Sequence, residues 1–389
     1  MRLTHLALES FRSYPAAELQ LDPGLTIVAG PNGAGKTNLL EAIFVTITGH
    51  SHRAAADHEL VHHGAPWARV RLDLASERGD PARIELLIPG LIPLAGVRKR
   101  LLVNGVPRRF SSVSETARAV LFRPEEMLLL VGSPGERRRF LDGILAQRDR
   151  RLARDLVELG RVLAQRNALL RAIRREEATT EGLGFWDEQL VLVGSRVMAA
   201  RLALVAELQE RIGPLHDAVA PSDEEAASVR LAYADSLKEA WAERGAGVPQ
   251  PEQLLEPFRR RLADVRQREL WNGVSLLGPQ RDDLRVELGG RDVAEHASRG
   301  QQRTIILALK LAETELLGEG DAPHPVVLLD DVFSELDAER SERSLTLLLE
   351  RGQVLVTMAD LGAIPAQQRR GVPVWQVDDG RLSLMPHVA

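Results

Sequence analysis

The chain has no cysteine in its 389 residues, which excludes disulfides, thiol nucleophiles and thiolate metal sites. It also lacks any run of about 18 apolar residues, so we expect no membrane span. Residues 1–6 do not form the apolar core of a secretory signal. Together these absences predict a protein of the reducing cytoplasm.

Lysine is scarce, occurring only at positions 36, 99, 238 and 310, whereas arginine is abundant. The net charge is −5 and the sequence pI about 6.1, so the chain as a whole is not basic. Any contact with nucleic acid must therefore come from local patches. The length, with 44% hydrophobic and 27% charged residues, suffices for two or three globular domains.

A phosphate-binding loop is the most specific motif. It has the pattern Gly, four residues, Gly-Lys and Ser/Thr, and comprises Gly30, Pro31, Asn32, Gly33, Ala34, Gly35, Lys36 and Thr37. Residues 25–29 before it are apolar and rich in β-branched side chains, which predicts a buried strand, and residues 38–43 after it predict a helix. Strand, glycine loop and helix are the context that this motif requires.

The chemistry of such a loop explains its residue types. Backbone N–H groups and the positive end of the helix dipole surround a phosphate. Lys36 adds a charge on the β and γ oxygens, and the Thr37 hydroxyl ligates Mg²⁺. A chance glycine-rich turn is the alternative, but one of only four lysines falls on the critical position. The sequence therefore predicts a site for ATP and Mg²⁺.

A second nucleotide motif is predicted where an apolar strand, residues 325–329, runs into Asp330 and Asp331. Asp330 is expected to hold Mg²⁺ opposite Thr37, and Asp331 to orient the attacking water. These two are the candidate catalytic residues. The alternative is an acidic cap on a strand end, because paired aspartates are common.

A third motif, Ser298-Arg299-Gly300-Gln301, opens the predicted helix 301–317. Alone, it is typical of an ordinary helix cap. Its position between the phosphate loop and Asp330, followed by residues 334–337, resembles the order of motifs in ABC-type ATPase heads. In that class Ser298, Gly300 and Gln301 would bind the γ-phosphate held by a second copy, so each chain would carry two half-sites.

The remaining pattern predicts an α/β chain whose ATPase head is interrupted. Alternating runs at 69–74 and 83–88, and a hairpin of 97–103 and 106–110 turning at Asn104-Gly105, predict sheet in the first third. Residues 125–268 have helical spacing, with breaks expected at 181–184, 213–214, 220–223 and 245–249. We therefore predict a discontinuous head, 1–124 and 269–389, and a mostly helical arm, 125–268.

Several segments make the resemblance specific. They are Ser10-Phe11-Arg12-Ser13-Tyr14, residues 121–126, residues 131–142, Gly278-Pro279-Gln280-Arg281-Asp282-Asp283-Leu284 and residues 328–337. In this order they resemble the RecF family. The resemblance implies an ABC/SMC-type P-loop ATPase head with a helical arm, and nucleotide contact by Arg12. It further implies weak, DNA-dependent ATP hydrolysis and an ATP-dependent homodimer on gapped or single-strand-containing DNA. The resemblance also implies that RecO and RecR are partners in loading recombinase, and that no membrane is involved.

Three positions depart from the wider ABC pattern. Asp331 stands where glutamate is usual, and being one methylene shorter it predicts slow turnover. Thr357 follows the next strand where a transporter ATPase has histidine, and Arg123 stands where glutamine is expected. A transporter-type ATPase subunit, or an adaptor that binds nucleotide without hydrolysis, are the alternative functions.

DNA contacts are predicted only at the level of candidate clusters. The arginine-rich clusters are Arg98-Lys99-Arg100, Arg108-Arg109, Arg137-Arg138-Arg139, Arg148-Asp149-Arg150-Arg151, Arg174-Arg175 and Arg259-Arg260-Arg261. A hairpin tip at Asn104-Gly105 could present several cations to phosphates, but mixed solvated faces are the alternative. The irregularly spaced histidines between 50 and 63 are expected to be surface residues, not metal ligands.

Overall fold

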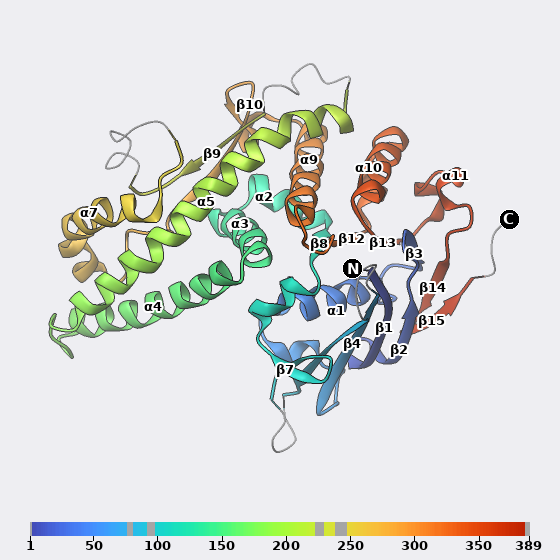
Figure 1. Ribbon diagram of the computed structural model, residues 1–389, viewed down its shortest axis with the longest axis horizontal. Helices are drawn as coiled ribbons and strands as arrows, with labels where there is room; N and C mark the ends of the chain where they lie inside the picture. Colours follow the sequence, from blue (N-terminus) through green and yellow to red (C-terminus); the bar gives the residue numbers. More distant parts are fainter. Residues whose placement is uncertain (1, 76–80, 92–97, 222–228, 238–246, 386–389) are drawn as a thin grey trace. The chain divides into compact units, whose positions relative to one another are not determined.

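The computed structural model describes residues 2–75, 81–91, 98–221, 229–237 and 247–385 (Figure 1). The chain divides into two compact units. Unit 1 comprises Met1–Glu126, Ala218–Ala220 and Leu307–Ala389, and unit 2 comprises Met127–Asp217 and Pro221–Ile306. Residues 269–306 belong to unit 2, so the compact units differ there from the predicted head and arm, a division that stays a prediction of functional domains.

Unit 1 contains an antiparallel sheet of six strands. Its strands, in spatial order, are β2 (Tyr14–Gln20), β1 (Arg2–Phe11), β4 (Trp67–Ala75), β5 (Ala82–Pro89), β6 (Arg100–Val103) and β7 (Val106–Arg108). Buried and more exposed residues alternate along β4 and β5, which is the pattern of strands with one face on the core. The predicted alternating runs and the Asn104-Gly105 hairpin are confirmed.

A second sheet of unit 1 is mostly parallel. Its order is β15 (Arg381–Leu384), β14 (Val374–Asp378), β3 (Leu25–Ala29), β13 (Val354–Met358), β12 (Val326–Asp330) and β8 (Ala119–Phe122). Every residue of β3, β12 and β13 is buried, as expected for central parallel strands. The carboxyl ends of β3, β12 and β13 therefore meet at one edge, where loops can build a site.

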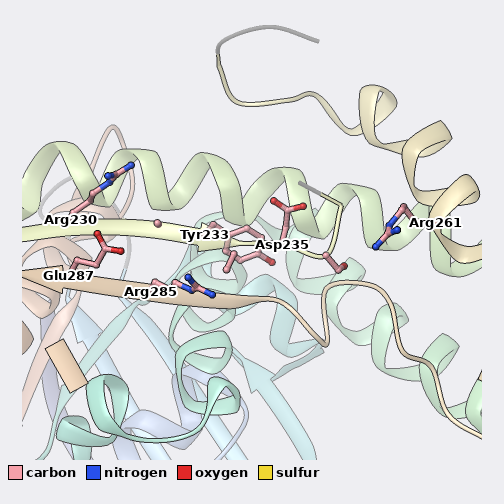
Figure 2. A pocket seen from close by; sticks show the side chains of 9 residues that line it. Arg230, Tyr233, Asp235, Arg261, Arg285 and Glu287 are labelled. Carbon is pink, nitrogen blue, oxygen red and sulfur yellow. The ribbon is translucent and has the colours of Figure 1, made fainter. Parts of the chain in front are cut away.

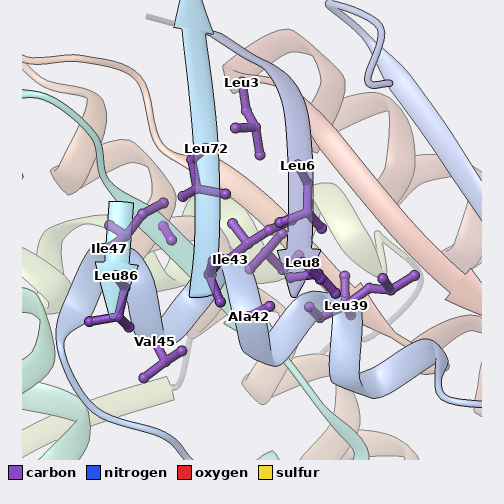
Figure 3. Packing of buried hydrophobic residues seen from close by; sticks show 14 of the residues in the cluster. Leu3, Leu6, Leu8, Leu39, Ala42, Ile43, Val45, Ile47, Leu72 and Leu86 are labelled. Atoms are coloured by element: carbon purple, nitrogen blue, oxygen red, sulfur yellow. The ribbon is translucent and has the colours of Figure 1, made fainter. Parts of the chain in front are cut away.

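Helix α1 (Lys36–Thr48) packs into the core of unit 1 (Figure 3). Leu39, Ala42 and Ile43 lie with Leu6 and Leu8 of β1 in one buried cluster. The helix follows β3 directly, so its N-terminus is fixed by the core. The other helices of unit 1 are α10 (Ala338–Arg351), α11 (Ala366–Arg369), η1 (Asp57–Leu60), η2 (Phe110–Glu115), η6 (Val332–Glu335) and η7 (Leu361–Ala363).

Unit 2 is mainly helical. Its elements are α2 (Leu128–Val131), α3 (Pro134–Arg148), α4 (Arg150–Arg174), α5 (Leu183–Val219), α7 (Pro251–Asn272), α8 (Val293–His296) and a sheet in the order β11 (Arg291–Asp292), β10 (Asp283–Leu288) and β9 (Val229–Ala234). Helix η3 (Pro124–Met127) leads into it from unit 1, and α9 (Arg299–Gly318) begins in unit 2 and ends in unit 1.

Helix α5 is long and apolar enough to cross a membrane, with an 18-residue window of mean hydropathy 1.5. However, 61% of that window is buried. Val191, Val197 and Met198 pack with Val162 of α4 and Phe258 of α7. The helix is therefore the core helix of unit 2, which explains its composition without a membrane.

In the helical region one strand was not predicted, and one predicted break is wrong. Strand β9 lies inside residues 125–268 and pairs antiparallel with β10. Buried and more exposed residues alternate along it. The strand depends on pairing with a segment far along the chain, which local sequence does not reveal. The break expected at Gly213-Pro214 does not occur, since α5 continues to Val219 with Pro214 inside it. An interior proline removes an N–H donor and crowds the preceding turn, but α5 continues past it for five residues. The predicted positions 97, 222–223 and 245–246 lie outside the described residues.

Candidate functional site

The phosphate loop joins β3 to α1, and its glycines are required by its geometry. Gly35 is the N-cap of α1 with φ 111°, a left-handed conformation that favours glycine. A Cβ there would lie 2.7 Å from Ser13 Oγ, and a Cβ at Gly30 would lie 2.4 Å from Val377 O. The Tyr14 hydroxyl donates to Gly35 O at 3.0 Å. Ser13 and Tyr14 therefore contact the loop at Gly35, a role that the motif itself does not indicate.

Lys36 folds back over the loop. Its Nζ donates to Gly30 O at 2.8 Å and to Pro31 O at 2.9 Å. Pro31 and Asn32 at the loop tip are exposed, whereas Ala34 is buried. The ammonium thus lies on carbonyl oxygens of the loop, so an incoming phosphate would compete with them for it.

Thr37 and Asp330 meet as predicted from the motifs. Thr37 Oγ1 donates to Asp330 Oδ1 at 3.0 Å, although 293 positions separate the two residues. The same carboxylate oxygen accepts from Thr357 Oγ1 at 2.7 Å. A hydroxyl and a carboxylate converging on one point are the oxygen ligands that Mg²⁺ prefers, so the residues present fit that ion.

Asp331 follows β12 in a left-handed conformation, with φ 52°. Its N–H donates to Thr357 O at 3.0 Å, and its carbonyl accepts from Ser334 Oγ at 2.8 Å. This φ is uncommon for a residue other than glycine, and it turns the chain sharply after the strand. Thr357, where histidine was expected by analogy, therefore holds both aspartates in place through its side chain and backbone.

Charges at this edge of the sheet act on one another. Burial lowers the pKa of Lys36, while the charges of Asp331 and Asp330 oppose that shift. Burial raises the pKa of Asp331, with Lys36 lowering it and Asp330 raising it further. The cation and the two carboxylates thus share one partly desolvated region, which is typical of functional sites.

Arg12, predicted to contact nucleotide, is engaged by other groups. Its Nε and Nη2 each donate to the carboxylate of Glu41 at 2.8 Å, and Nη1 donates to Glu59 O at 2.8 Å. Burial alone would raise the pKa of Glu41, but hydrogen bonds from Arg12 and Ser51 bring it below its ordinary value. Glu41, fully buried in α1, escaped sequence analysis because a single helical glutamate carries no motif. The nucleotide contact by Arg12 stays a prediction.

Arg123 and His52 lie in the same unit. Arg123 Nε donates to Glu126 Oε1 at 3.2 Å. His52 packs edge-on against Phe44, with ring centroids 5.9 Å apart, and its ring nitrogens are buried. Burial and the charge of Arg123 lower the pKa of His52 to about 4. His52 is thus not the surface histidine that we expected. In the described part of the chain, no group of three acids or histidines could hold a metal.

The Ser298 motif lies in unit 2, at the start of α9. Gln301 N donates to Ser298 Oγ at 3.2 Å, and Ser298 N donates to Gln301 Oε1 at 2.8 Å. This reciprocal pair is a capping box, and its spacing of Ser and Gln three residues apart could have been recognised in the sequence. Ser298 is exposed and Gly300 is partly exposed, so this helix start is accessible.

Two further segments of the resemblance, residues 131–142 and 278–284, meet inside unit 2. Arg137 makes a bidentate ion pair with Asp283, at 2.7 and 2.9 Å. Arg138 donates to Asp282 O at 2.7 Å, and Arg201 donates to Pro279 O at 2.6 Å. Residues 131–142 and 278–284 are therefore connected directly by an ion pair and hydrogen bonds. From β10 the chain continues through β11 and α8 to Ser298.

A pocket of about 420 Å³ lies beside β9 and β10 (Figure 2). Arg230, Arg285 and Arg261 line it together with Asp235 and Glu287. Because both signs of charge are present, the pocket has no simple preference for an anion. It contains none of the motif residues, so the nucleotide site remains the principal candidate.

Comparison with known proteins places this geometry in a family. The chain matches the model of the RecF/RecN/SMC N terminal domain over residues 2–377. It is 41% identical over 383 residues to the DNA replication and repair protein RecF of Kineococcus radiotolerans, covering 95% of each chain. With the protein of that name from Chloroflexus aggregans it shares 37% identity over 399 residues, covering 98% of this chain and 99% of the other.

Solved structures of similar proteins lead to the same family. The recombination mediator protein RecF-ATPrS in the RecFOR pathway matches with a TM-score of 0.86 and 27% identity, over 99% of this chain and 98% of that one. An SMC head bound to the C-winged helix domain of ScpA matches with a TM-score of 0.55 and 14% identity, which supports the fold alone. The chain therefore belongs to the RecF family of SMC-type ATPases.

Proposed function

We propose that this protein is an ATP-dependent DNA-binding protein of recombinational repair. ATP bound at residues 30–37 drives two heads together on DNA that contains gaps or single strands, and slow hydrolysis releases it. The observation that carries the proposal is the Thr37–Asp330 hydrogen bond of 3.0 Å. It unites the two nucleotide motifs in unit 1, while the third motif stands accessible on α9.

Binding depends on residues that already converge. The N–H groups of the loop and the start of α1 would take the phosphates, with Lys36 transferring its hydrogen bonds from loop carbonyls to phosphate oxygens. Thr37 and Asp330 would hold Mg²⁺, which supplies positive charge to the β- and γ-phosphates. The matched structures of RecF-ATP and RecF-ATPrS support the choice of nucleotide.

Hydrolysis would use Asp331 to orient water. Its turn after β12, held by Thr357 O and Ser334 Oγ, fixes the carboxylate close enough to Lys36 to feel its charge. The aspartate is one methylene shorter than glutamate, so water would be held less closely and turnover would be slow. A slow ATPase suits a switch that must stay closed while bound to DNA.

Dimerisation would complete each site. Ser298, Gly300 and Gln301 from a second copy would bind the γ-phosphate, exchanging the internal capping box for contacts with the nucleotide. ATP then acts by population shift, because it binds the dimer better than the monomer. The RecFOR pathway named for the matched structures supports RecO and RecR as partners.

Solution mass with and without ATP tests the proposal. We expect a monomer alone, a dimer with ATP, and a further complex when gapped DNA is added. Ser298→Arg should bind ATP yet remain monomeric, because only the half-site given to the other copy is changed. A wild-type protein that stays monomeric with ATP would refute dimerisation.

Phosphate release and gel mobility on DNA, measured beside solution mass, separate two alternatives. A nucleotide-binding adaptor would form the ATP dimer but release no phosphate over many hours, with DNA or without it. A transporter-type subunit would hydrolyse ATP without a shift in gel mobility on gapped, single-stranded or duplex DNA.

A further inference from the structure

The hairpin of β6 and β7 lies at one edge of the antiparallel sheet, where Figure 1 labels β7. Its positive charge has no counter-charge among the described residues. Arg98, Arg100, Arg108 and Arg109 are all exposed. In the part of the chain that the structure describes, none of the four forms an ion pair or a side-chain hydrogen bond. An edge strand rich in cations is protected against pairing with another strand, but that protection does not need four unpaired arginines.

The strand register shows how the charge accumulates. Across the sheet Glu9 pairs with Arg69, Arg69 with Leu87, and Leu87 with Arg100. Glu9 and Arg69 form an ion pair of 3.6 Å, so charge is balanced at that end of the row. Leu101 pairs with Arg108, which is the last residue of β7, and Arg109 follows it as the N-cap of η2.

Glu85 is the nearest acid along this row of the sheet. It lies on the same face of β5 as Leu87, opposite Leu102, but among the described residues it makes no ion pair with Arg100 or Arg109. The positive charge of the hairpin is therefore left for a partner outside the chain.

Each competing arginine cluster contains at least one ion pair. Arg137 binds Asp283, and Arg139 binds Glu136. Arg148 binds Glu207 at 2.8 Å, and Arg259 binds Glu188 at 2.8 Å. Ion pairing therefore distinguishes clusters that looked equivalent in the sequence, because the hairpin cluster alone among these has four exposed arginines without an ion pair or side-chain hydrogen bond in the described residues.

Lys99, between Arg98 and Arg100, has a different role. Its Nζ donates to Asp57 Oδ1 at 2.6 Å and to Gly49 O at 2.9 Å, and it lies over the Phe110 ring. Gly49 caps the C-terminus of α1. Lys99 thus fastens the base of the hairpin to the phosphate-loop helix, and leaves the four arginines as the exposed cations.

We propose that this hairpin, through Arg98, Arg100, Arg108 and Arg109, binds the sugar-phosphate backbone of DNA. The inference rests on the proposed function and names the surface that contacts DNA. Guanidinium groups on an extended ribbon suit phosphate oxygens and do not depend on base sequence. Affinity at this surface falls with salt, since each neutralised phosphate releases counterions.

Titration of fluorescent duplex DNA in the presence of ATP, at several salt concentrations, tests the surface. In the double variant Arg100→Gln/Arg109→Gln we expect the slope of log K against log salt to fall in magnitude by about 1.8, about 0.9 for each lost contact. The same slope predicts roughly a 100-fold loss of affinity near 0.1 M salt. Because both side chains are exposed and neither forms an ion pair in the described structure, Tm should change little.

Arg139→Gln is the matched control, since it removes an exposed arginine that is already paired with Glu136. It should leave the salt slope unchanged. Unchanged DNA affinity and slope in the double variant, together with normal ATP-dependent dimerisation, would overturn the hairpin assignment and leave the proposed function standing. Weaker binding with an unaltered slope would also overturn it, because the lost contacts would not be ionic.

Discussion

Charged side chains are arranged differently in the two units. In unit 1 Lys36, Thr37, Asp330 and Asp331 gather at the carboxyl edge of a parallel sheet, beside an exposed loop tip. In unit 2 Arg166, which is 1% exposed, is enclosed by protein partners on every side of its guanidinium. The charged groups of the first arrangement can still bind a ligand, whereas the guanidinium of the second already has protein partners. We expect changes in the first to affect binding, and changes in the second to affect folding.

The largest effect is expected from Arg166→Leu in unit 2. Arg166 pairs with buried Glu269 at 2.6 Å and with Asp187 at 2.8 Å, and donates to Ser275 Oγ. Removing the cation leaves Glu269 buried without its counter-charge, which costs about 3–5 kcal/mol. Urea unfolding should show this loss. An unfolding free energy within about 1 kcal/mol of wild type would mean that the network contributes little.

Lys36→Met should weaken ATP binding strongly and change the free energy of unfolding only slightly. Loss of charge-assisted hydrogen bonds, worth about 1.5–3 kcal/mol each, predicts ATP binding weaker by roughly 100-fold or more, with a stability change much smaller than that of Arg166→Leu. Isothermal titration and urea unfolding of both variants give the comparison. A Lys36→Met protein that still dimerises with ATP would contradict the assignment of the phosphate loop.

Asp331→Asn addresses turnover at the open site. A residue that orients water contributes roughly 10²–10⁴-fold to the rate, so phosphate release should fall by about that factor while ATP and dimer are retained. Dimer lifetime after removal of free ATP should lengthen in parallel. Rapid dissociation of the variant dimer would exclude Asp331 from this role.

Buried charge in unit 2 should also appear as a pH effect. Burial raises the pKa of Asp282 to about 6, although the Tyr233 hydroxyl donates to it. The folded state then binds the proton more tightly than the unfolded state, so stability from this group is present at low pH and is lost as pH rises through about 6. From pH 5 to 7 the free energy of unfolding should fall by about 1 kcal/mol more in wild type than in Asp282→Asn. Equal pH dependence of the two proteins would contradict the raised pKa.

The smallest effect is expected at the start of α9. Gln301→Ala removes one half of the capping box and should lower the unfolding free energy by about 0.5–1 kcal/mol. If Gln301 also contacts nucleotide in the dimer, the loss in ATP-dependent dimerisation will exceed the loss in stability. Gln368→Ala, far along the chain, is a control for removal of a glutamine amide.

Much of unit 1 could be predicted because its signals are local. The apolar run at 25–29, the glycine loop and the Asn104-Gly105 turn each restrict the backbone strongly, and β3, α1 and the hairpin form where expected. Strand β9 could not be separated from its helical surroundings, because its pairing with β10 spans about 50 residues. Pro214 also misled the prediction, since packing of α5 outweighs one missing hydrogen bond.

The sequence by itself determined the motifs and their order, because spacing along a strand, loop or helix is fixed by covalent geometry. Only the tertiary structure decided which partners these residues meet. In the folded chain Thr37 and Thr357 both donate hydrogen bonds to the Asp330 carboxylate. Arg12 donates to the carboxylate of Glu41. The tertiary structure also paired most arginine clusters with acids and left the hairpin arginines exposed. Such contacts depend on which strands and helices become neighbours, and one-dimensional spacing does not contain that information.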